Sequence, residues 1–344
     1  MSQLPQVRHQ QPTPLRIGLV YDLFDAYPWQ PGEAPDADVE YEPEVTLLAL
    51  EDAVRALGHT PMRLGTAYDL FRDIHTVQVD AAINIAEAAR SRNREAYAPI
   101  LLEMASIPFL GSDALTLSLS LDKAWTKDLA MAAGVATPAY RCYANADAID
   151  AADLPGPFPL FVKPRYEGSS KGITAASRVT TLDELRAQVA HQTQMYQQDV
   201  LVEAFVAGGG EFTVAVVGHD PPRALPVLQR AVERETRIGL HALERRGLAE
   251  ADYAFDLEGA LTPDLEAKLQ SDTLRIFEKL QCHDFARADF RVDADGKPWF
   301  LEINPLPTFA PDGTFAILAE LIGQSYPDFL ASVLHDGLQR LGLA

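Results

Sequence analysis

Residues 286–304 read ARADFRVDADGKPWFLEIN, which is the strongest structural signal in the chain. Apolar and polar residues alternate on both sides of Asp-Ala-Asp-Gly, and such alternation is typical of half-buried β-strands. Asp-Gly favours a tight turn, and Lys297 and Pro298 follow it. The stretch therefore predicts a β-hairpin whose turn centres between Asp295 and Gly296.

This turn would place Asp289 opposite Glu302 and Arg287 opposite Asn304. Because strand side chains alternate with a period of two, these polar groups would share one face of the hairpin. The other face would be filled by the intervening apolar residues Ala288, Phe290, Leu301 and Ile303.

The polar face of this hairpin has two interpretations. An exposed ladder of cross-strand charge pairs would alternate in sign. Most of these groups are instead oxygen acceptors, and Mg²⁺ prefers hard oxygen ligands that it shares with water and phosphate. We therefore predict a Mg²⁺ site formed by Asp289, Glu302 and Asn304, in which Mn²⁺ can replace Mg²⁺.

A second stretch, FVKPRYEGSSKGI at residues 161–173, ends an apolar run with Lys163 and continues into a Gly-Ser-Ser loop. A solvated hairpin tip is one interpretation of it. The other is a loop whose backbone N–H groups bind phosphate, with Lys163 and Lys123 as counter-charges. The chain has neither a P-loop nor a GxGxxG motif, so the phosphate hypothesis depends on this loop and these lysines.

Two glutamates interrupt or begin apolar strands. Glu203 lies within DVLVEAFV at residues 199–206, and Glu211 begins EFTVAVVG. A carboxylate at the edge of an apolar slot can accept a hydrogen bond from a ribose hydroxyl, while a strand-end charge in water is the alternative. The backbone of Ala204, Phe205 and Val206 could then pair with an adenine edge.

The order of the remaining elements predicts an α/β fold with three parts. In residues 15–111, strands (15–22, 59–64, 80–87, 107–111) alternate with helices (43–58, 94–106), which indicates a doubly wound α/β domain. Residues 112–204 predict a small α+β domain with a helix at 112–134, strands at 159–164, 171–179 and 199–206, and a helix at 181–196. That last helix begins with a capping box of Thr181 and Glu184. Residues 205–344 contain the hairpin, a charged segment at 231–252, a helix at 264–280 and a helical tail, and residues 1–14 predict a disordered leader.

Composition narrows the class of protein. A net charge of −20 argues against nucleic acid or an anionic membrane as a partner. The polar N-terminus resembles no signal peptide, and Cys142 and Cys282 are not in a metal-binding spacing. We therefore expect a cytoplasmic protein with small-molecule partners.

The chain resembles the D-alanine–D-alanine ligases of the ATP-grasp superfamily. The resemblance spans about residues 15–335 and rests on four motifs in the family's order and spacing: GSDALTLSLSLDKAWTK, FVKPRYEGSSKG, DVLVEAFVAGGGEFTVAVVG and ARADFRVDADGKPWFLEINP. It implies a two-part α+β ATP-grasp core after the first domain, with ATP held between the two parts. It also implies that an acyl phosphate forms with release of ADP, that an amine then displaces phosphate, and that the protein is a homodimer.

The resemblance assigns roles to individual residues. Lys123 and Lys163 would bind the ATP phosphates, and Arg287 would stabilise the acyl phosphate. The adenosine would contact Glu203, Ala204, Phe205, Val206 and Glu211, and the metal would contact Asp289, Glu302 and Asn304. The loop that closes over the phosphates would contain Glu167, Gly168, Ser169, Ser170 and Gly172, and Glu42 would hold the ammonium group of the first amino acid.

The departures from the family pattern all concern positions at which the family binds its amino-acid substrates. NIAEAARSRNREAY lacks the family's histidine, and Arg245 and Arg246 replace a lysine and a tyrosine. Thr308 and Gly313 stand where the family has residues that bind the acceptor carboxylate. We therefore expect a ligase for a pair other than D-alanine, such as one in the biosynthesis of mycosporine-like compounds. A true D-alanine–D-alanine ligase and a non-catalytic ATP sensor are the alternatives, and Lys171 has no predicted role.

Overall fold

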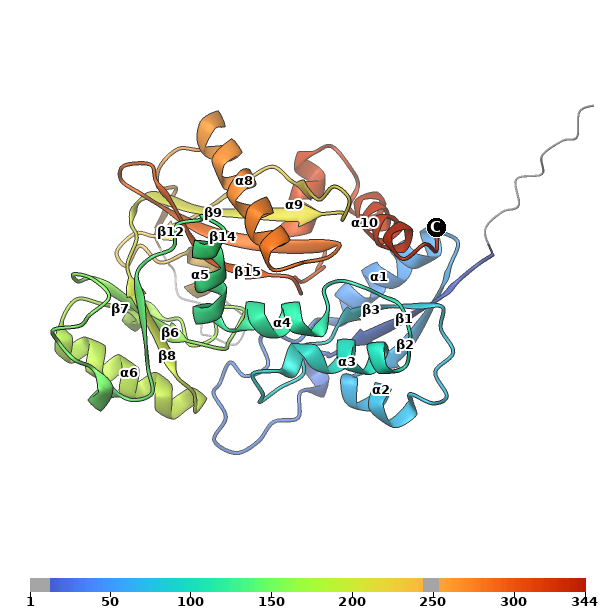
Figure 1. The fold of residues 1–344 in the computed structure, drawn as a ribbon, viewed down its shortest axis with the longest axis horizontal. Helices are drawn as coiled ribbons and strands as arrows, with labels where there is room; N and C mark the ends of the chain where they lie inside the picture. The colour runs from blue at the N-terminus through green and yellow to red at the C-terminus, as the bar shows by residue number, and fades with distance from the viewer. Residues whose placement is uncertain (1–12, 244–253) are drawn as a thin grey trace, which may run out of the picture.

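The structure is a computed structural model that describes residues 13–243 and 254–344 (Figure 1). Most of the predicted leader at 1–14 lies outside the described residues. The first sheet has the order β2 (Thr60–Gly65), β1 (Arg16–Tyr21), β3 (Ala81–Ile85), β4 (Phe109–Leu110), and all its pairs are parallel. The predicted parallel sheet is thus confirmed.

Helices cover both faces of this sheet. Ile17 and Leu19 pack with Leu47 of α1 (Glu44–Ala56). The next residue, Val20, points to the other face and packs with α2 (Ala67–Asp73) and α3 (Tyr97–Met104). This alternation confirms the prediction of a doubly wound domain. The C-terminal helix α10 (Tyr326–Arg340) lies beside α1, so these two helices, far apart in the sequence, share one core (Figure 1).

The predicted helix over 112–134 is interrupted. Asp122 is extended and separates α4 (Ala114–Leu121) from α5 (Lys123–Ala132). Its carboxylate accepts hydrogen bonds from the N–H groups of Ala124 and Trp125 and pairs with Arg165 at 2.8 Å. A single helix was therefore the wrong prediction, because Asp122 caps a new helix whose first residue is Lys123.

The second sheet is antiparallel and has the order β5 (Tyr140–Tyr143), β8 (Val200–Ala204), β6 (Leu160–Pro164), β7 (Arg178–Val179). Helix α6 (Leu182–Tyr196) covers it. The strand predicted over 171–179 is wrong except for β7, because Gly172 has φ +74° and a turn precedes it. The capping box is displaced by one residue: Thr181 caps the N–H of Glu184, whereas the Glu184 carboxylate accepts from the N–H of Thr180.

The third sheet is antiparallel and contains the hairpin. Its order is β10 (Arg223–Ala224), β9 (Gly208–Val217), β14 (Phe285–Asp293), β15 (Pro298–Asn304), and β11 (Leu228–Arg230) also pairs with β9. Helix α8 (Pro263–Lys279) packs on its buried face. The helix α9 (Thr314–Leu321) follows the hairpin.

The hairpin register agrees with the prediction at the polar residues and departs from it nearer the turn. Arg287 pairs with Asn304 and Asp289 with Glu302. A register shift follows, so that Phe290 pairs with Phe300. Phe300 is therefore in the buried core, and the prediction that Leu301 fills this face is wrong.

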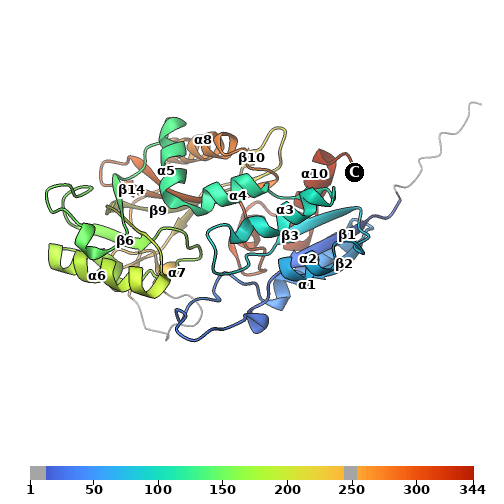
Figure 2. The same ribbon diagram turned by 60° about the horizontal axis from the view of Figure 1, so that its bottom comes forward.

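The charged segment at 231–252 lies only partly within the described residues. It contains β12 (Val232–Glu233), which pairs with β13 (Phe255–Asp256), and α7 (Leu240–Leu243). Ile238 and the α7 side chains pack against Phe161 of β6, and Figure 2 shows α7 beside the second sheet.

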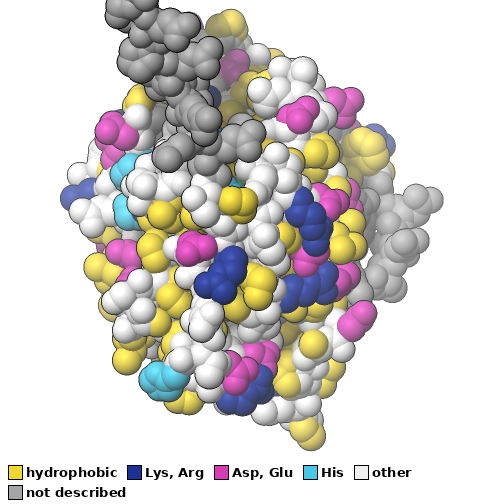
Figure 3. All heavy atoms as spheres, turned by 90° about the vertical axis from the view of Figure 1, so that its right-hand side faces the viewer, with side chains coloured by type: hydrophobic (Ala, Val, Ile, Leu, Met, Phe, Trp, Pro, Cys, Tyr) yellow, Lys and Arg dark blue, Asp and Glu magenta, His cyan; other side chains and the backbone are white. Residues whose placement is uncertain are grey.

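No helix in the described parts of the chain is long and apolar enough to cross a membrane. On the face shown in Figure 3, acidic and basic side chains are interspersed among apolar ones.

Candidate functional site

Two neighbouring cavities lie where the second and third sheets and the first domain meet. Together with the open solvent at its mouth, the first spans about 640 Å³ and the second about 440 Å³. Glu302 lines both. The first is lined by the predicted nucleotide residues Lys163, Ser170, Glu203, Ala204, Phe205, Val206 and Glu211, and by Asp289. The second is lined by Lys123, Gly168, Ser169, Arg287 and Asn304.

The first cavity combines apolar walls with a buried row of charges. Phe161, Ile173 and Leu301 are among its apolar lining residues. Leu301 reaches it because the register shift in the hairpin turns that residue out of the core. Apolar side chains of this kind suit a flat aromatic ring, and the charged residue Glu302 lines both this cavity and the second.

Glu203 lies at the floor of the first cavity between two lysines. Its carboxylate is 2.7 Å from Lys127 Nζ and 2.8 Å from Lys163 Nζ. Burial acts to raise the pKa of Glu203, but the two lysines outweigh it and lower that pKa. Glu203 is therefore a charged group whose two oxygens each lie within ion-pair distance of a lysine, which the sequence did not indicate.

Lys127 is a buried residue that the sequence analysis missed. Its side chain is fully buried and donates to Thr137 Oγ1 at 2.8 Å. Burial lowers the pKa of Lys127 to about 8, although Glu203 acts in the opposite direction. A spacing of four residues puts it on the same helix face as Lys123, and that spacing was the available signal.

The predicted metal ligands project from one face of the hairpin, as their cross-strand pairing requires. Asp289 accepts from Thr213 Oγ1 at 2.6 Å and pairs with Arg287 at 3.2 Å. Glu302 pairs with Lys123 at 3.2 Å. Burial raises the pKa of Glu302, but Lys123, Lys163 and Arg287 together lower it to about 2, so its carboxylate is ionised.

The donor set fits a hard cation that shares its ligands with a bound molecule. Asp289, Glu302 and Asn304 supply oxygen atoms, of which the Asn304 oxygen also accepts from the N–H of Leu306. Within residues 13–243 and 254–344, no group of three His, Cys, Asp or Glu side chains could hold a metal alone. A cation here would thus depend on water and phosphate oxygens, as Mg²⁺ commonly does.

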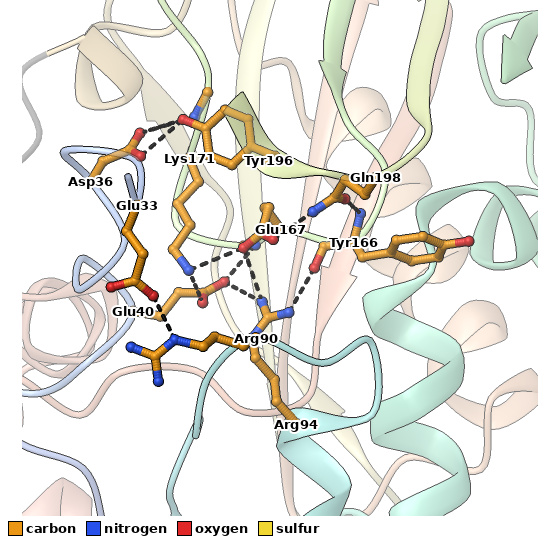
Figure 4. A network of polar contacts seen from close by, with 12 residues as sticks. Glu33, Asp36, Glu40, Arg90, Arg94, Tyr166, Glu167, Lys171, Tyr196 and Gln198 are labelled. Atoms are coloured by element: carbon orange, nitrogen blue, oxygen red, sulfur yellow. Dashed lines mark hydrogen bonds and ion pairs between the residues drawn. The ribbon is translucent and has the colours of Figure 1, made fainter. Parts of the chain in front are cut away.

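The loop at 167–172 lies against the first domain through a buried ionic network (Figure 4). Glu40 accepts from the N–H of Gly168, from Arg94 Nη2 and from Lys171 Nζ, each at 2.6 Å. Lys171 also pairs with Glu167 at 3.0 Å. Burial raises the pKa of Glu40, but Arg94 and Lys171 lower it to about 2. Lys171, which had no predicted role, therefore links the loop to the first domain.

Further contacts of this loop come from the same side. Asp36 accepts from the N–H of Gly172 at 3.1 Å and from the hydroxyl of Tyr196 at 2.9 Å. Arg94 Nη1 donates to the carbonyl of Tyr166 at 2.8 Å (Figure 4). The loop has the compact backbone of a turn, with positive φ angles at Ser169 and Ser170. Glu40 and Arg94 carried no motif that would have identified them.

The predicted amino-acid residues are only partly brought together. Glu42 accepts from Thr308 Oγ1 at 2.9 Å and from Thr46 Oγ1 at 2.7 Å. Burial raises the pKa of Glu42, and these hydrogen bonds act against it. Gly313 precedes α9 near Thr308. Neither Glu42 nor Thr308 lines the two cavities, and Arg245 and Arg246 lie outside the described residues.

Comparison with known proteins gives consistent matches. The family model described as "D-ala D-ala ligase C-terminus" matches residues 133–335. A D-alanine–D-alanine ligase from Cupriavidus necator is 34% identical over 236 residues, which cover 68% of this chain and 69% of that protein. An uncharacterized protein from Sinorhizobium fredii is 30% identical over 252 residues, which cover 73% of this chain and 72% of that protein.

Solved structures show the same fold at lower identity. A D-alanine–D-alanine ligase from Bacillus anthracis complexed with ATP aligns with a TM-score of 0.69 and 20% identity over 94% of this chain and 98% of its own. A D-Ala:D-Ser ligase from Enterococcus faecalis aligns with a TM-score of 0.69 and 19% identity, and the alignment covers 94% of this chain and 99% of that protein.

Proposed function

Because this chain belongs to the D-alanine–D-alanine ligase family of the ATP-grasp superfamily, whose members are ADP-forming ligases, we propose that it joins a carboxylate to an amine at the expense of ATP. The observation that supports this most directly is the pair of cavities that share Glu302 as a lining residue. One is lined by the residues predicted to bind nucleotide, and the other by Arg287, Lys123 and Asn304.

In this proposal the base of ATP occupies the first cavity, between Phe161 and Leu301, and its phosphates point toward Glu302. Lys163 and Lys123 neutralise phosphate charge from two sides of the junction. Asp289, Glu302 and Asn304 would hold Mg²⁺ together with the phosphates, and the bound ion would supply charge neutralisation there. The protein contributes position and electrostatics, and it needs no covalent nucleophile.

The reaction takes place in the second cavity. A carboxylate oxygen attacks the γ-phosphorus, and the bond to the β-phosphate oxygen breaks to release ADP. The amine nitrogen then attacks the acyl carbon of the acyl phosphate, inorganic phosphate leaves, and the nitrogen loses a proton. Arg287 lines this cavity and stabilises the negative charge that develops in both steps. The loop at 167–172 excludes water, which would otherwise hydrolyse the acyl phosphate.

We further propose that the amino-acid pair is not D-alanine with D-alanine. Thr308 donates a hydrogen bond to Glu42, neither residue lines the two cavities, and Glu40, Glu87 and Glu95 line the second cavity together with Arg287. The second candidate is a true D-alanine–D-alanine ligase. The relative from Cupriavidus necator, which has that name, favours this candidate.

The test measures ADP release with Mg²⁺, ATP and pairs of amino acids and other carboxylates. We expect no robust turnover with D-alanine alone and turnover with another pair. Arg287→Ala should lower that turnover by about 10²–10³-fold while ATP still binds. Robust turnover with D-alanine alone would establish the second candidate, and turnover indifferent to Arg287→Ala would contradict the proposed mechanism.

A further inference from the structure

A chain of hydrogen bonds reaches Asp289, one of the predicted metal ligands, from the neighbouring strands of the third sheet. Thr213 of β9 lies opposite Asp289 of β14, and its hydroxyl donates to Asp289 Oδ1 at 2.6 Å. Thr213 Oγ1 in turn accepts from Arg230 Nε at 3.2 Å. Arg230 belongs to β11, which pairs with β9 on the side opposite β14. Three strands thus contribute one polar group each to this chain of contacts.

The contact with Arg230 decides where the Thr213 hydroxyl points. A hydroxyl has one hydrogen to donate, whereas an arginine stays protonated and can only donate. Because the Arg230 guanidinium occupies the oxygen of Thr213 as a donor, the hydroxyl hydrogen is directed to Asp289 Oδ1. Asp289 Oδ2 accepts from Arg287 Nη2 at 3.2 Å. The protein therefore orients both oxygens of this carboxylate.

Arg230 is itself held at a second point. Its Nη2 donates at 2.6 Å to the hydroxyl of Thr314, the first residue of α9. Thr213 and Thr314 are only 2% and 6% exposed, so bulk water does not compete for either hydroxyl. Within the parts of the chain that the structure describes, no carboxylate lies within ion-pair distance of Arg230. Its hydrogen bonds therefore go to two neutral hydroxyls, one of which leads to Asp289.

The charge of Arg230 alone would act against a cation at Asp289. One hydroxyl group separates the guanidinium from this carboxylate, and a positive charge at so short a range repels a metal ion. Orientation has the opposite effect, because a ligand that is fixed by hydrogen bonds holds its metal more tightly. The two roles therefore predict opposite changes in metal affinity when Arg230 is removed.

We propose that Arg230 and Thr213 are positioning residues that fix the Asp289 carboxylate and thereby raise the affinity of the site for Mg²⁺. The inference rests on the proposed function, in which Asp289 holds the ion together with Glu302 and Asn304. Arg230 and Thr213 line neither of the two cavities, so they act through Asp289. Groups that orient a metal ligand in this way commonly change metal affinity by about 10–100-fold.

Calorimetric titration of the full chain with a non-hydrolysable ATP analogue tests the inference. The analogue is titrated once in EDTA and once in saturating Mg²⁺, and the ratio of the two dissociation constants reports how much the ion tightens binding. Thr213→Val removes the hydroxyl and keeps the branched side chain, and it should lower this ratio about tenfold or more. Thr213→Ser keeps the hydroxyl and should stay within about threefold of the unmodified protein. Arg230→Met should lower the ratio about threefold or more, although it removes a positive charge.

A double variant shows whether Arg230 acts through Thr213. When Thr213→Val is already present, adding Arg230→Met should lower the ratio by less than about twofold further. Arg223→Met is the matched control, because Arg223 is an exposed arginine of the same sheet that pairs with Asp336, and it should keep the ratio of the unmodified protein. Thermal unfolding checks that each variant is folded, and Thr213→Ala replaces Thr213→Val if the latter is not.

Three results would overturn the inference. The first is an unchanged or larger ratio in Arg230→Met, which is the effect of charge alone. The second is an equal effect of Arg230→Met with and without the Thr213 hydroxyl, and the third is a Thr213→Ser protein as impaired as Thr213→Val.

The dependence of ADP release on Mg²⁺ separates this inference from the proposed function. In Thr213→Val the Mg²⁺ concentration for half-maximal ADP release should rise about tenfold, while the rate at saturating Mg²⁺ changes by less than about threefold. If Mg²⁺ did not tighten binding of the analogue to the unmodified protein, the proposed metal site and this inference would both be wrong. If the unmodified protein required Mg²⁺ and the variants behaved like it, the proposed function would stand and this inference alone would be wrong.

Discussion

Lys127 shows what a single residue adds to a charge arrangement that the sequence only partly indicates. Lys163 and Glu203 were both predicted to contact the nucleotide, and the structure places them 2.8 Å apart with Lys127 on the other Glu203 oxygen. The pair of lysines holds Glu203 ionised despite its burial. Residue types in strands could suggest a binding role, but they could not show that these groups satisfy one another.

Glu95 leads to a prediction about the pH dependence of stability. Its pKa is about 7 in the folded protein against an ordinary value of 4.5, so the folded state binds its proton more tightly than the unfolded state does. The stability of the protein should therefore fall as the pH rises from about 4.5 to about 7. Above that range the ionised carboxylate costs roughly 3 kcal/mol, since each pKa unit is worth about 1.4 kcal/mol.

Urea unfolding of Glu95→Gln at several pH values checks this prediction. Above pH 7 the variant should be more stable than the unmodified protein. Between pH 4.5 and 7 its free energy of unfolding should no longer show the decrease that Glu95 causes. Glu103→Gln, which removes an exposed charge from the following helix, should leave the slope unchanged. A Glu95→Gln protein less stable at pH 8 than the unmodified one would show that the carboxylate has a favourable partner.

At the scale of elements, the sequence predicted strands and helices best where their pattern was long and their turn chemistry was local. The Asp-Gly turn predicted the hairpin and its polar pairs, and these are confirmed. The register shift after Asp289 could not be predicted, because it depends on how Phe300 packs under α8. The helix break at Asp122 could not be predicted either, because Asp122 pairs with Arg165, which lies 43 residues later in the sequence.

The register shift has a testable consequence for two neighbouring residues. Phe300 is fully buried, so Phe300→Ala should destabilise the fold by about 3–5 kcal/mol. Leu301 lines the first cavity, so Leu301→Ala should cost less stability and weaken nucleotide binding by about tenfold. Thermal unfolding and titration with an ATP analogue measure the two effects. If the hairpin were regular and had no register shift, Leu301→Ala would cause the larger loss of stability and Phe300→Ala would weaken nucleotide binding.

The loop at 167–172 is the element to whose description the structure adds most. The resemblance predicted a lid, and the network around Glu40 explains how the loop is held and why Lys171 belongs to it. Lys171→Met should remove two ion pairs and allow the loop to open about tenfold more often. Hydrogen exchange of residues 167–172 should rise accordingly.

The same variant tests the exclusion of water. If the loop protects an acyl phosphate, Lys171→Met should release more ADP than ligated product, because water intercepts the intermediate. Arg141→Gln, which removes an exposed ion pair with Asp153, is the control and should keep one ADP per product. If the hydrogen exchange of the loop were faster but one ADP were still released per ligated product, the loop would not be what excludes water.

At the scale of the molecule, the sequence predicted the fold class but not the contacts that join distant parts of the chain. Periodicity predicted a helical tail, and nothing in it indicated that α10 would pack on α1 (Figure 1). The glutamates Glu40, Glu87 and Glu95 that line the second cavity are a similar case. They come from the first domain, whereas Arg287 comes from the hairpin, and only tertiary structure brings them to one cavity.

The shared core of α1 and α10 predicts that the first domain and the C-terminal helix are stabilised together. Leu334 of α10 is 1% exposed and belongs to the core cluster that contains Leu47 and Leu50 of α1. Leu334→Ala should therefore lower the free energy of unfolding by about 2–5 kcal/mol. It should also raise hydrogen exchange in α1 and β1, which lie near the opposite end of the sequence. Gln339→Ala, an exposed change in the same helix, should do neither. Increased exchange confined to α10 would show that the helix frays without weakening the first domain, and the shared core would then not be a single cooperative unit.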